Sequence, residues 1–315
     1  MTVESATGEE GGGVPVTVLI PVLNGAATVG DMLRALLAQA EALPGMEVLV
    51  VDNGSTDGTQ AIVQQFPVTL LHEPRRGISA ARNCGLRAAR GALIVCLDAD
   101  TLPTRRWLRE IVRPFEDPAV VLAAGAIQTF QPETAAERYC DASGIFHPCH
   151  HAQAKVLPFA VGMNMAVRRA AAQEVGGWDE AFRWGEDVDF SRRLLKAHPG
   201  ALVYCARALV FHRNRTTTAA LARQANGYGR GTAMIYQRYP DETPWGIRQI
   251  FTVFGLLAGR GIGAGVMWCG RMLRLVRPER AELRVCHALW SWCFWRGFFQ
   301  QYYGARKVGG GAAHE

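Results

Sequence analysis

The stretch Ala92–Asp100, with the sequence ALIVCLDAD, constrains the fold more than any other part of this chain. Its five consecutive apolar residues, 93–97, predict a strand that is buried on both faces. Two carboxylates, Asp98 and Asp100, follow at the carboxyl end. If the backbone stays extended there, both can face one cation, because residues two apart in a strand lie on the same side. A polar turn that caps a core strand is the alternative, since D-x-D triplets are common.

The first half of the chain alternates strands with helices. Residues 16–21 (VTVLIP) and 47–51 (EVLVV) predict buried strands, each followed by a helix, and a short strand (68–71) and a further helix (78–89) precede the opening stretch. This alternation predicts a parallel α/β sheet, in which ligands bind beyond the carboxyl ends of the strands. Carboxylates at that edge suit Mg²⁺ or Mn²⁺, which are usually held together with substrate phosphates.

The second half is less regular, and residues 130–157 have no clear periodicity. Its predicted elements are a helix (107–115), a strand (120–128), a strand broken near 162–164 (159–167), a helix (190–197) and a strand that ends at His212 (202–211). The histidine-rich segment around His147 and Cys149 lacks a second ligand pair at zinc spacing, so we interpret it as a variable loop.

Composition and charge limit the classes of partner. The chain has a net charge of +6, but residues 246–315 alone hold ten Lys or Arg against three acids, which leaves the rest of the chain nearly neutral. A basic, aromatic C-terminal region on a near-neutral body indicates an anionic surface rather than nucleic acid as partner. Eight cysteines without a C-x-x-C pair favour reduced thiols. Residues 1–13 match neither a signal nor a transit peptide, so a cytoplasmic location is expected.

Seven motifs in order resemble a family 2 glycosyltransferase of the GT-A fold, over about residues 15–236. They are IPVLNG, VVDNGSTDGT, GISAARNCG, LDAD, GMNMAVRR, GGWDE and GEDVDF. The resemblance implies a GT-A-type, Rossmann-like, mostly parallel sheet flanked by helices. It also implies transfer of a sugar from a nucleotide sugar, with UDP-sugars favoured, to an acceptor hydroxyl with inversion at the anomeric carbon. A sugar nucleotidyltransferase and a catalytically inactive sugar- or lipid-binding scaffold are the alternatives.

The resemblance also implies roles for the residues near the donor. Asp52 is expected at the nucleotide base, with a local Asx-turn as the alternative, and Asn53 replaces an Asp that many relatives have, which leaves the base open. Arg82 is expected at the diphosphate or the nucleotide, with a solvated helix arginine as the alternative. The other residues expected around the nucleotide sugar are Pro21, Asn24, Ser55, Asp98 and Ala99.

Metal and catalytic roles are implied in the same way. Asp100 is expected to bind Mn²⁺ or Mg²⁺ directly, and His212 to reach the metal or the departing diphosphate, with a surface histidine as the alternative. Asp187 is the expected general base, and Glu186 is expected to bind the acceptor or to orient the base. The alternative is that either residue only caps the helix that starts here. Asp189 is expected to turn away. On the acceptor side we expect Asn164, Trp178 and Trp184, although both tryptophans also suit a core.

The C-terminal region predicts a helical, membrane-associated segment. Residues 250–270 contain one charge, Arg260, and residues 283–303 are rich in aromatics, with a basic stretch between them. A central arginine costs roughly 2.5–3.5 kcal/mol in a membrane span, so attachment to an anionic leaflet, spanning and burial in a core or dimer all remain open. We therefore divide the chain into a disordered tail (1–13), a GT-A domain (14–240), a membrane-associated helical region (241–305) and a tail (306–315). The acceptor is expected to be lipid-linked, a glycan or a hydrophobic metabolite.

Overall fold

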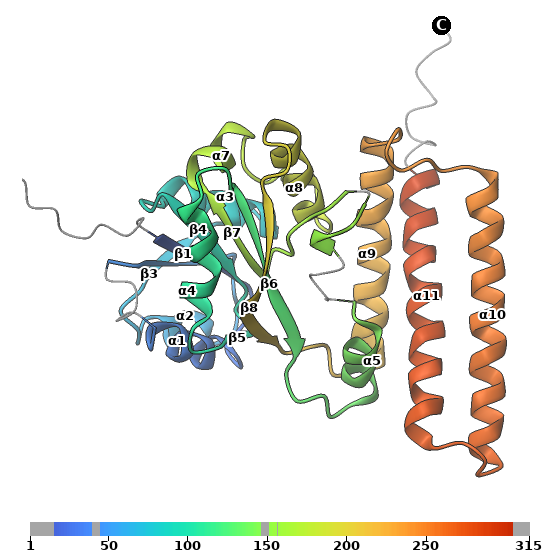
Figure 1. The fold of residues 1–315 in the computed structure, drawn as a ribbon. Helices are drawn as coiled ribbons and strands as arrows, with labels where there is room; N and C mark the ends of the chain where they lie inside the picture. Colours follow the sequence, from blue (N-terminus) through green and yellow to red (C-terminus); the bar gives the residue numbers. More distant parts are fainter. Residues whose placement is uncertain (1–15, 40–44, 146–150, 156, 305–315) are drawn as a thin grey trace, which may run out of the picture.

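A computed structural model describes residues 16–39, 45–145, 151–155 and 157–304 of the protein. Within these residues one eight-stranded sheet forms, in the order β3-β2-β1-β4-β7-β6-β8-β5 (Figure 1). The strands are β1 (Val16–Val22), β2 (Glu47–Asp52), β3 (Thr69–His72), β4 (Leu93–Leu97), β5 (Thr101–Pro103), β6 (Leu122–Thr129), β7 (Asn164–Arg168) and β8 (Leu202–His212).

The sheet is mixed, with a parallel half built from the first strands of the chain. β1 pairs in parallel with β2 and β4, β2 with β3, and β6 with β8. β7 runs antiparallel to both β4 and β6, and β5 antiparallel to β8. Four of these seven pairings are therefore parallel. The apolar runs predicted the strands but not the reversed direction of β7, because a strand buried on both faces reads the same either way.

Helices cover both faces of the sheet and bury two apolar clusters. The helices of this part are α1 (Val29–Leu37), α2 (Thr59–Val63), α3 (Ile78–Ala88), α4 (Trp107–Val112), α5 (Ala135–Ser143), α7 (Arg169–Glu174) and α8 (Glu186–Ala197). One apolar cluster packs α1 and α4 on one face of the sheet, with Met32, Leu36 and Trp107 fully buried, and the other packs α3 and α8 on the opposite face, with Trp178 and Phe190. A 3-10 turn, η2 (Arg113–Glu116), continues α4.

Helix α5 lies in the segment for which the sequence showed no periodicity. Thr134 accepts a hydrogen bond from the amide of Glu137, whose carboxylate in turn accepts from the amide of Thr134. This capping box, T-x-x-E, was readable in the sequence as a helix start. The short length of α5 and its small residues hid the apolar period.

Three long helices stand beside the sheet domain: α9 (Thr218–Arg238), α10 (Ile247–Met272) and α11 (Pro278–Gly304) (Figure 1). α11 packs very closely on α9, since a Cβ at Gly229 would lie 1.8 Å from the Phe294 carbonyl oxygen, and one at Gly297 would lie 2.1 Å from that of Asn226. Only glycine permits these contacts, so α11 is held directly against α9.

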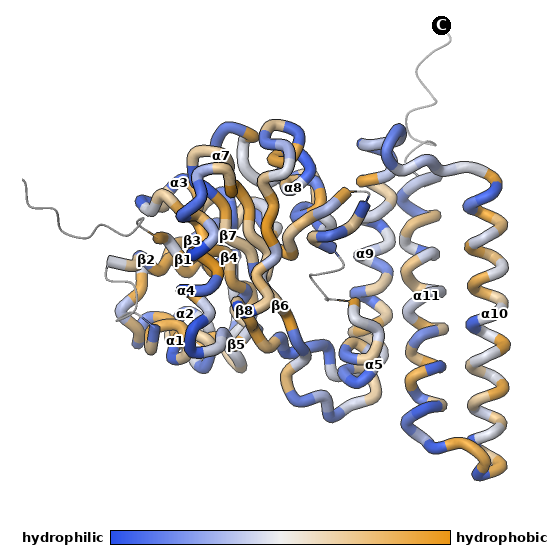
Figure 2. The backbone as a smooth tube through the Cα atoms, in the orientation of Figure 1, coloured by the Kyte–Doolittle hydropathy of each residue, from blue (hydrophilic) through white to orange (hydrophobic). Residues whose placement is uncertain are grey.

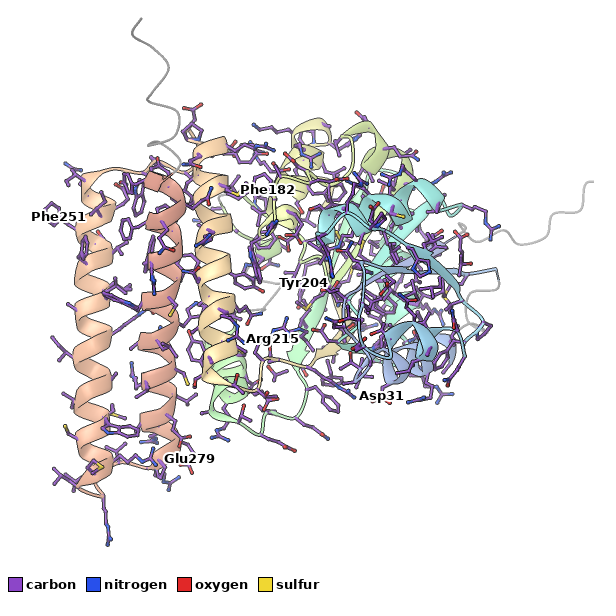
Figure 3. All side chains as sticks on the ribbon, turned by 180° about the vertical axis from the view of Figure 1, so that it is seen from behind. Asp31, Phe182, Tyr204, Arg215, Phe251 and Glu279 are labelled. Atoms are coloured by element: carbon purple, nitrogen blue, oxygen red, sulfur yellow. The ribbon has the colours of Figure 1, made fainter. Side chains whose placement is uncertain are left out.

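α10 packs mainly on α11 and lies at the outer edge of the molecule, where much of its length is coloured as hydrophobic in Figure 2. Most of its large apolar side chains are exposed. Phe251 is 71% exposed and points away from α11 in Figure 3. By length and composition alone, α10 is the one described helix that could cross a membrane. Its most apolar 18 residues have a mean hydropathy of 1.6, and only 6% of them are buried. Further large apolar side chains exposed on α10 are Ile247, Phe254, Ile262, Val266 and Met272.

The described cysteines are all free thiols, as the absence of C-x-x-C spacing predicted. Cys96 is buried in β4, where burial raises the pKa of its thiol to about 12. Such a thiol is not ionised at neutral pH and packs as a small apolar residue. Cys149 lies outside the described residues.

Candidate functional site

The D-A-D triplet bends immediately after β4, so its two carboxylates face different partners. The Thr101 amide and hydroxyl both donate to the carbonyl oxygen of Asp98, at 3.1 and 2.6 Å, and close a turn. The backbone is therefore not extended here, although an extended backbone was the condition for one ion shared through strand geometry. Asp98 turns to Arg82, whereas Asp100 turns to His212.

Asp100 and His212 form a pair at the end of β8. The register of β5 and β8 places Thr101 opposite His212, and His212 Nε2 lies 3.6 Å from Asp100 Oδ2. On its other side, His212 Nδ1 lies 3.0 Å from Asn214 Oδ1, and Asn214 donates to the Thr129 hydroxyl at 3.1 Å. Asn214 was missed from the sequence, where an Asn two residues beyond a candidate ligand gives no distinct signal. It orients the ring so that Nε2 faces Asp100.

Burial and opposite charge act against each other at this pair. Burial raises the pKa of Asp100, but the nearby His212 ring outweighs it and lowers the pKa overall. Burial lowers the pKa of His212, and the Asp100 and Asp98 carboxylates more than reverse this. At Asp98, burial raises the pKa and prevails over Arg82. His212 is thus a buried partner of a carboxylate, and the surface-histidine alternative is wrong, since the residue is 6% exposed.

Arg82 connects the D-A-D turn to the start of α8. It is 1% exposed, and it donates to Glu186 Oε1 at 2.8 Å and to Asp98 Oδ1 at 3.3 Å. Gly162 leaves room for the guanidinium, because a Cβ there would lie 2.4 Å from Arg82 Nη2. The ring of Trp178 covers the guanidinium from another side, with its centre 5.9 Å from the guanidinium carbon. Burial lowers the pKa of Arg82, but Asp98 and Glu186 raise it overall. The alternative of a solvated helix arginine is therefore wrong.

The carboxylate pair Glu186 and Asp187 begins α8, after Gly185 in a left-handed conformation (φ 77°). Glu186 is 8% exposed, and burial, with the charge of Asp187, raises its pKa to about 7. Asp187 is more accessible; its Oδ2 accepts from the Gly162 amide at 3.2 Å, and burial raises its pKa. The two side chains thus differ in access: Glu186 is held by Arg82, whereas Asp187 is partly open.

Asp189 turns away from this pair, as predicted. It is fully buried and binds Arg193, Arg238 and Tyr239 at 2.8–2.9 Å. Since Arg238 and Tyr239 lie at the end of α9, Asp189 links α8 to that helix.

The loop after β2 carries the residues expected near the nucleotide. Asp52 is 1% exposed, and its carboxylate accepts from the amides of Gly54 and Ser55, each at 3.2 Å, and from Gln60 Nε2 at 2.9 Å. This is the Asx-turn arrangement, and the contact of Asp52 with a base stays a prediction. Pro21 lies within β1, and Asn24, with φ 53°, accepts from the Thr56 amide.

Asn53 holds the loop 73–77 in place. Its Nδ2 donates to the carbonyl oxygens of Glu73 and Arg75, both at 2.8 Å, and its Oδ1 accepts from the Gly77 amide at 2.8 Å. This loop leads directly into α3 and Arg82. The side-chain amide of Asn53 therefore makes all three hydrogen bonds to the backbone of this loop. An ionised Asp could accept from the Gly77 amide but could not donate to the two carbonyl oxygens.

Asn164, expected on the acceptor side, lies in the core. It is fully buried, and its amide donates to the carbonyl oxygens of Ala126 and Ala208 at 2.7 and 2.9 Å and accepts from Trp107 Nε1 at 2.8 Å. These bonds fill the irregularity between β6 and β8 next to Gly125. An acceptor role for Asn164 is therefore wrong, because its polar atoms are taken up by the sheet.

The two tryptophans expected on the acceptor side differ in their surroundings. Trp178 is 1% exposed and stacks on Phe190 at 4.2 Å, so it is a core residue and cannot stack on a sugar. Trp184 is half-buried, lies against Gly227 of α9 and meets Tyr228 edge-on at 5.4 Å. Of the two, Trp184 alone keeps the access that its predicted role needs.

A small cavity of about 100 Å³ lies behind His212 and Asn214. Cys140, Asp141 and Gly144 of the α5 region form its other wall. Arg213 is turned toward α1, where it binds Asp31 at 2.7 Å. Arg215 is exposed and lowers the pKa of Asp100; in Figure 3 it lies beside α9, on the side of the sheet.

The described residues contain no group of three or more His, Cys, Asp or Glu side chains that could hold a metal by themselves. Asp100 and His212 form a two-ligand set, with a carboxylate oxygen and an imidazole nitrogen 3.6 Å apart, and both atom types are ligands that a divalent cation accepts. Such a pair fits a cation shared with a ligand's phosphates. Of the histidine-rich loop, His147, Cys149 and His150 lie outside the described residues, and His151 contacts the Ile145 carbonyl at 3.1 Å.

A family model for glycosyl transferase family 2 matches residues 17–176, about half of the chain. Pre-mycofactocin glycosyltransferase of Mycobacterium tuberculosis is 35% identical over 286 residues, which cover 87% of this chain and 58% of that protein. Glycosyltransferase AglE of Haloferax volcanii is 33% identical over 190 residues, 58% of this chain and 62% of that protein. The chain thus spans about three fifths of the length of these curated relatives.

Solved structures share the fold. A mannosyltransferase from Pyrobaculum calidifontis, in complex with GDP-Man and Mn²⁺, matches with a TM-score of 0.62 at 22% identity, over 92% of this chain and 88% of that chain. Glucosyl-3-phosphoglycerate synthase from Mycobacterium tuberculosis, in complex with Mn²⁺, UDP and glucosyl-3-phosphoglycerate, matches with a TM-score of 0.55 at 17% identity, over 72% and 80%.

Proposed function

Because the chain belongs to glycosyl transferase family 2, we propose that it transfers a sugar from a nucleotide sugar to an acceptor hydroxyl, with inversion at the anomeric carbon. The family and the GT-A-type fold expected from the motifs are confirmed. The observation that carries the proposal is the Arg82 bridge, which joins the D-A-D turn to the carboxylate pair at the start of α8. It brings a site for diphosphate and metal next to a candidate base.

Asp100 and His212 would hold the divalent cation, Mn²⁺ or Mg²⁺, with the donor diphosphate completing its coordination. A bound cation would neutralise the charge that grows on the departing diphosphate. Asn214 orients His212 for this role, and exposed Arg215 adds positive charge beside Asp100. Both features support a site for an anionic leaving group.

Asp187 is the proposed general base. As the acceptor oxygen forms its bond to the anomeric carbon, the bond from that carbon to the diphosphate oxygen breaks, and the acceptor proton passes to the Asp187 carboxylate. Its partial exposure supports this assignment over Glu186, which is buried under Arg82. Glu186 is proposed to orient Arg82, and through it Asp98, at the ribose side of the donor.

The proposed donor is a UDP-sugar. A complex with UDP for glucosyl-3-phosphoglycerate synthase supports this choice, while the complex of the mannosyltransferase with GDP-Man keeps GDP as the competing nucleotide. Asp52, Asn53, Ser55, Asn24, Pro21 and Ala99 line the proposed nucleotide side. Trp184 is proposed on the acceptor side, and the acceptor is proposed to be lipid-linked, a glycan or a hydrophobic metabolite.

We also propose that the α10–α11 hairpin attaches a cytoplasmic enzyme to an anionic membrane surface, with residues 14–240 as the catalytic domain. Charge supports this: the turn between the helices exposes Leu273 (70%) and Leu275 (78%) next to Arg274 and Arg277. Apolar side chains flanked by arginines are typical of segments that dip into an anionic leaflet.

A thermal-shift screen tests the donor site. The chain is melted with UDP, GDP, dTDP or CMP, each with Mn²⁺ or with EDTA, since a ligand that binds the native state alone raises the melting temperature. We expect stabilisation by UDP that needs Mn²⁺. If no nucleotide stabilises the protein with the metal present, the donor site is wrongly assigned. A catalytically inactive scaffold is then favoured over a glycosyltransferase.

A further inference from the structure

A cationic cleft lies between α10 and α11, outside the site described above. It has a volume of about 270 Å³ and is lined by Leu256, Gly259, Arg260, Gly263, Arg284 and His287. Half of this lining consists of basic residues, the other half is apolar, and no carboxylate takes part. Pockets for drug-sized ligands measure about 300–1,000 Å³, so the cleft suits a group the size of a phosphate ester better than a whole nucleotide sugar.

The two guanidinium groups in the cleft carry charge that the described part of the chain does not pair. Arg260 donates to the Ser291 hydroxyl, a neutral partner, and no described carboxylate lies within 4.0 Å of either Arg260 or Arg284. Glu282, on the same helix as Arg284, is taken up by Arg138 at 2.9 Å and Arg271 at 3.5 Å. Paired cations without an acid favour an anion that accepts several charge-assisted hydrogen bonds, such as phosphate.

The surface around the cleft is apolar. Leu256, which lines it, is 37% exposed, and Phe254 and Ile262 on the same helix are 56% and 69% exposed. A free sugar phosphate would gain nothing from such a surface, whereas an acyl or prenyl chain would be removed from water along it. We infer that the cleft binds the phosphate group of a membrane lipid, with Arg260 and Arg284 as donors and the lipid chain against α10.

The cleft is one helix away from the proposed transfer site. Tyr139 of α5 meets the His287 ring with 5.8 Å between ring centres, and the next two residues, Cys140 and Asp141, line the cavity that contains His212. A lipid held between α10 and α11 would therefore have α5 between its head group and the metal ligands. Its use in sugar transfer rests on the proposed function; the binding itself does not.

Binding of a short-chain lipid tests the inference without the transfer reaction. The intact chain in an uncharged detergent is titrated with fluorescent dioctanoyl phosphatidate, and unlabelled dioctanoyl phosphatidate, dioctanoylglycerol and glycerol phosphate compete for it. We expect only the unlabelled phosphatidate to compete well. The Arg260→Gln/Arg284→Gln pair should weaken binding at least about ten-fold, since each lost contact is a charge-assisted hydrogen bond.

A matched pair, Arg105→Gln/Arg109→Gln, removes the same charge from exposed positions far from both helices of the hairpin and should change the affinity less than about two-fold. Equal losses in both pairs, or none in the cleft pair, would overturn the inference. If dioctanoylglycerol competes as well as phosphatidate, the cleft does not recognise the phosphate group. If glycerol phosphate competes as well as phosphatidate, the cleft does not recognise the lipid chain. Either result would overturn the inference. If the Arg260→Gln/Arg284→Gln double variant does not fold, the single variant Arg284→Gln is tested instead, because Arg284 is exposed and makes no described ion pair. We expect this single variant to bind phosphatidate about three-fold more weakly than the wild type.

Discussion

Arg82 donates a hydrogen bond to Glu186 across 104 positions of sequence, with 2.8 Å between Nη1 and Oε1, and both side chains are buried. The same guanidinium reaches Asp98. The candidate metal site and the candidate base are therefore held by one buried cation, and changes at Arg82 should affect both.

Substitution of Arg82 by Met should destabilise the fold and abolish turnover. It leaves buried Glu186 and half-buried Asp98 without their shared partner, and breaking a buried ion pair from one side costs roughly 3–5 kcal/mol. Urea denaturation measures the loss. Arg87→Met on the same helix is the control, since Arg87 is 61% exposed and should change stability by less than about 1 kcal/mol. Equal effects of both substitutions would contradict the bridge.

Asp187→Asn should remove turnover and spare donor binding. The amide keeps the size of the side chain but cannot take the acceptor proton, so the rate should fall by about 10²–10⁴-fold. The nucleotide-dependent thermal shift should persist. Glu174→Gln, at an exposed position of α7, is the control. An Asp187→Asn protein with full turnover would exclude Asp187 as the base.

The stability of the protein should fall between about pH 5 and pH 7 because of Glu186. Its folded-state pKa, about 7, lies above the ordinary value of 4.5. In this window the unfolded chain releases a proton that the native chain keeps, so the free energy of unfolding decreases as pH rises. Urea titrations at pH 5 and pH 8 measure the decrease, which should be smaller in Glu186→Gln. An identical pH dependence in both proteins would refute the raised pKa.

Asn214→Ala should weaken metal-dependent nucleotide binding. Without the Asn214 contact, His212 loses the group that orients its ring, and loss of the partner that orients a metal-binding histidine typically costs about 10–100-fold in metal affinity. The Mn²⁺ concentration needed for the UDP thermal shift should rise accordingly. Gln300→Ala, at an exposed position of α11, provides the comparison. If Asn214→Ala needs no more Mn²⁺ than the wild type, His212 is not a metal ligand.

The Arg274→Gln/Arg277→Gln pair should reduce flotation with anionic liposomes. Each arginine near an anionic surface contributes about 1 kcal/mol, so the pair should lower the partition coefficient by about 30-fold. Liposomes of neutral lipid provide the baseline, and added salt should have the same effect as the substitutions. If the wild-type chain is fully soluble without detergent and does not bind anionic liposomes, the proposed membrane attachment is wrong.

Several features were readable from the sequence because they depend on local pattern. The apolar runs predicted β1, β2 and β4, since a strand buried on both faces must be apolar throughout. The polar residues that follow each strand had to meet at one edge of a parallel sheet. The order of the motifs then identified the family, and the T-x-x-E start of α5 was present but overlooked.

Only the tertiary structure decided which side chains meet. The turn after β4 separates Asp98 from Asp100, Asn164 fills an irregularity in the sheet, and Trp178 lies under Arg82. Each of these depends on residues far away in the sequence, and periodicity describes only the face of an element, not what covers it. For the same reason the sequence determined that an acidic edge and an apolar C-terminal hairpin exist. Packing across the molecule determined that Arg82 joins Asp98 to Glu186 and that Arg260 faces Arg284 across a cleft without a carboxylate.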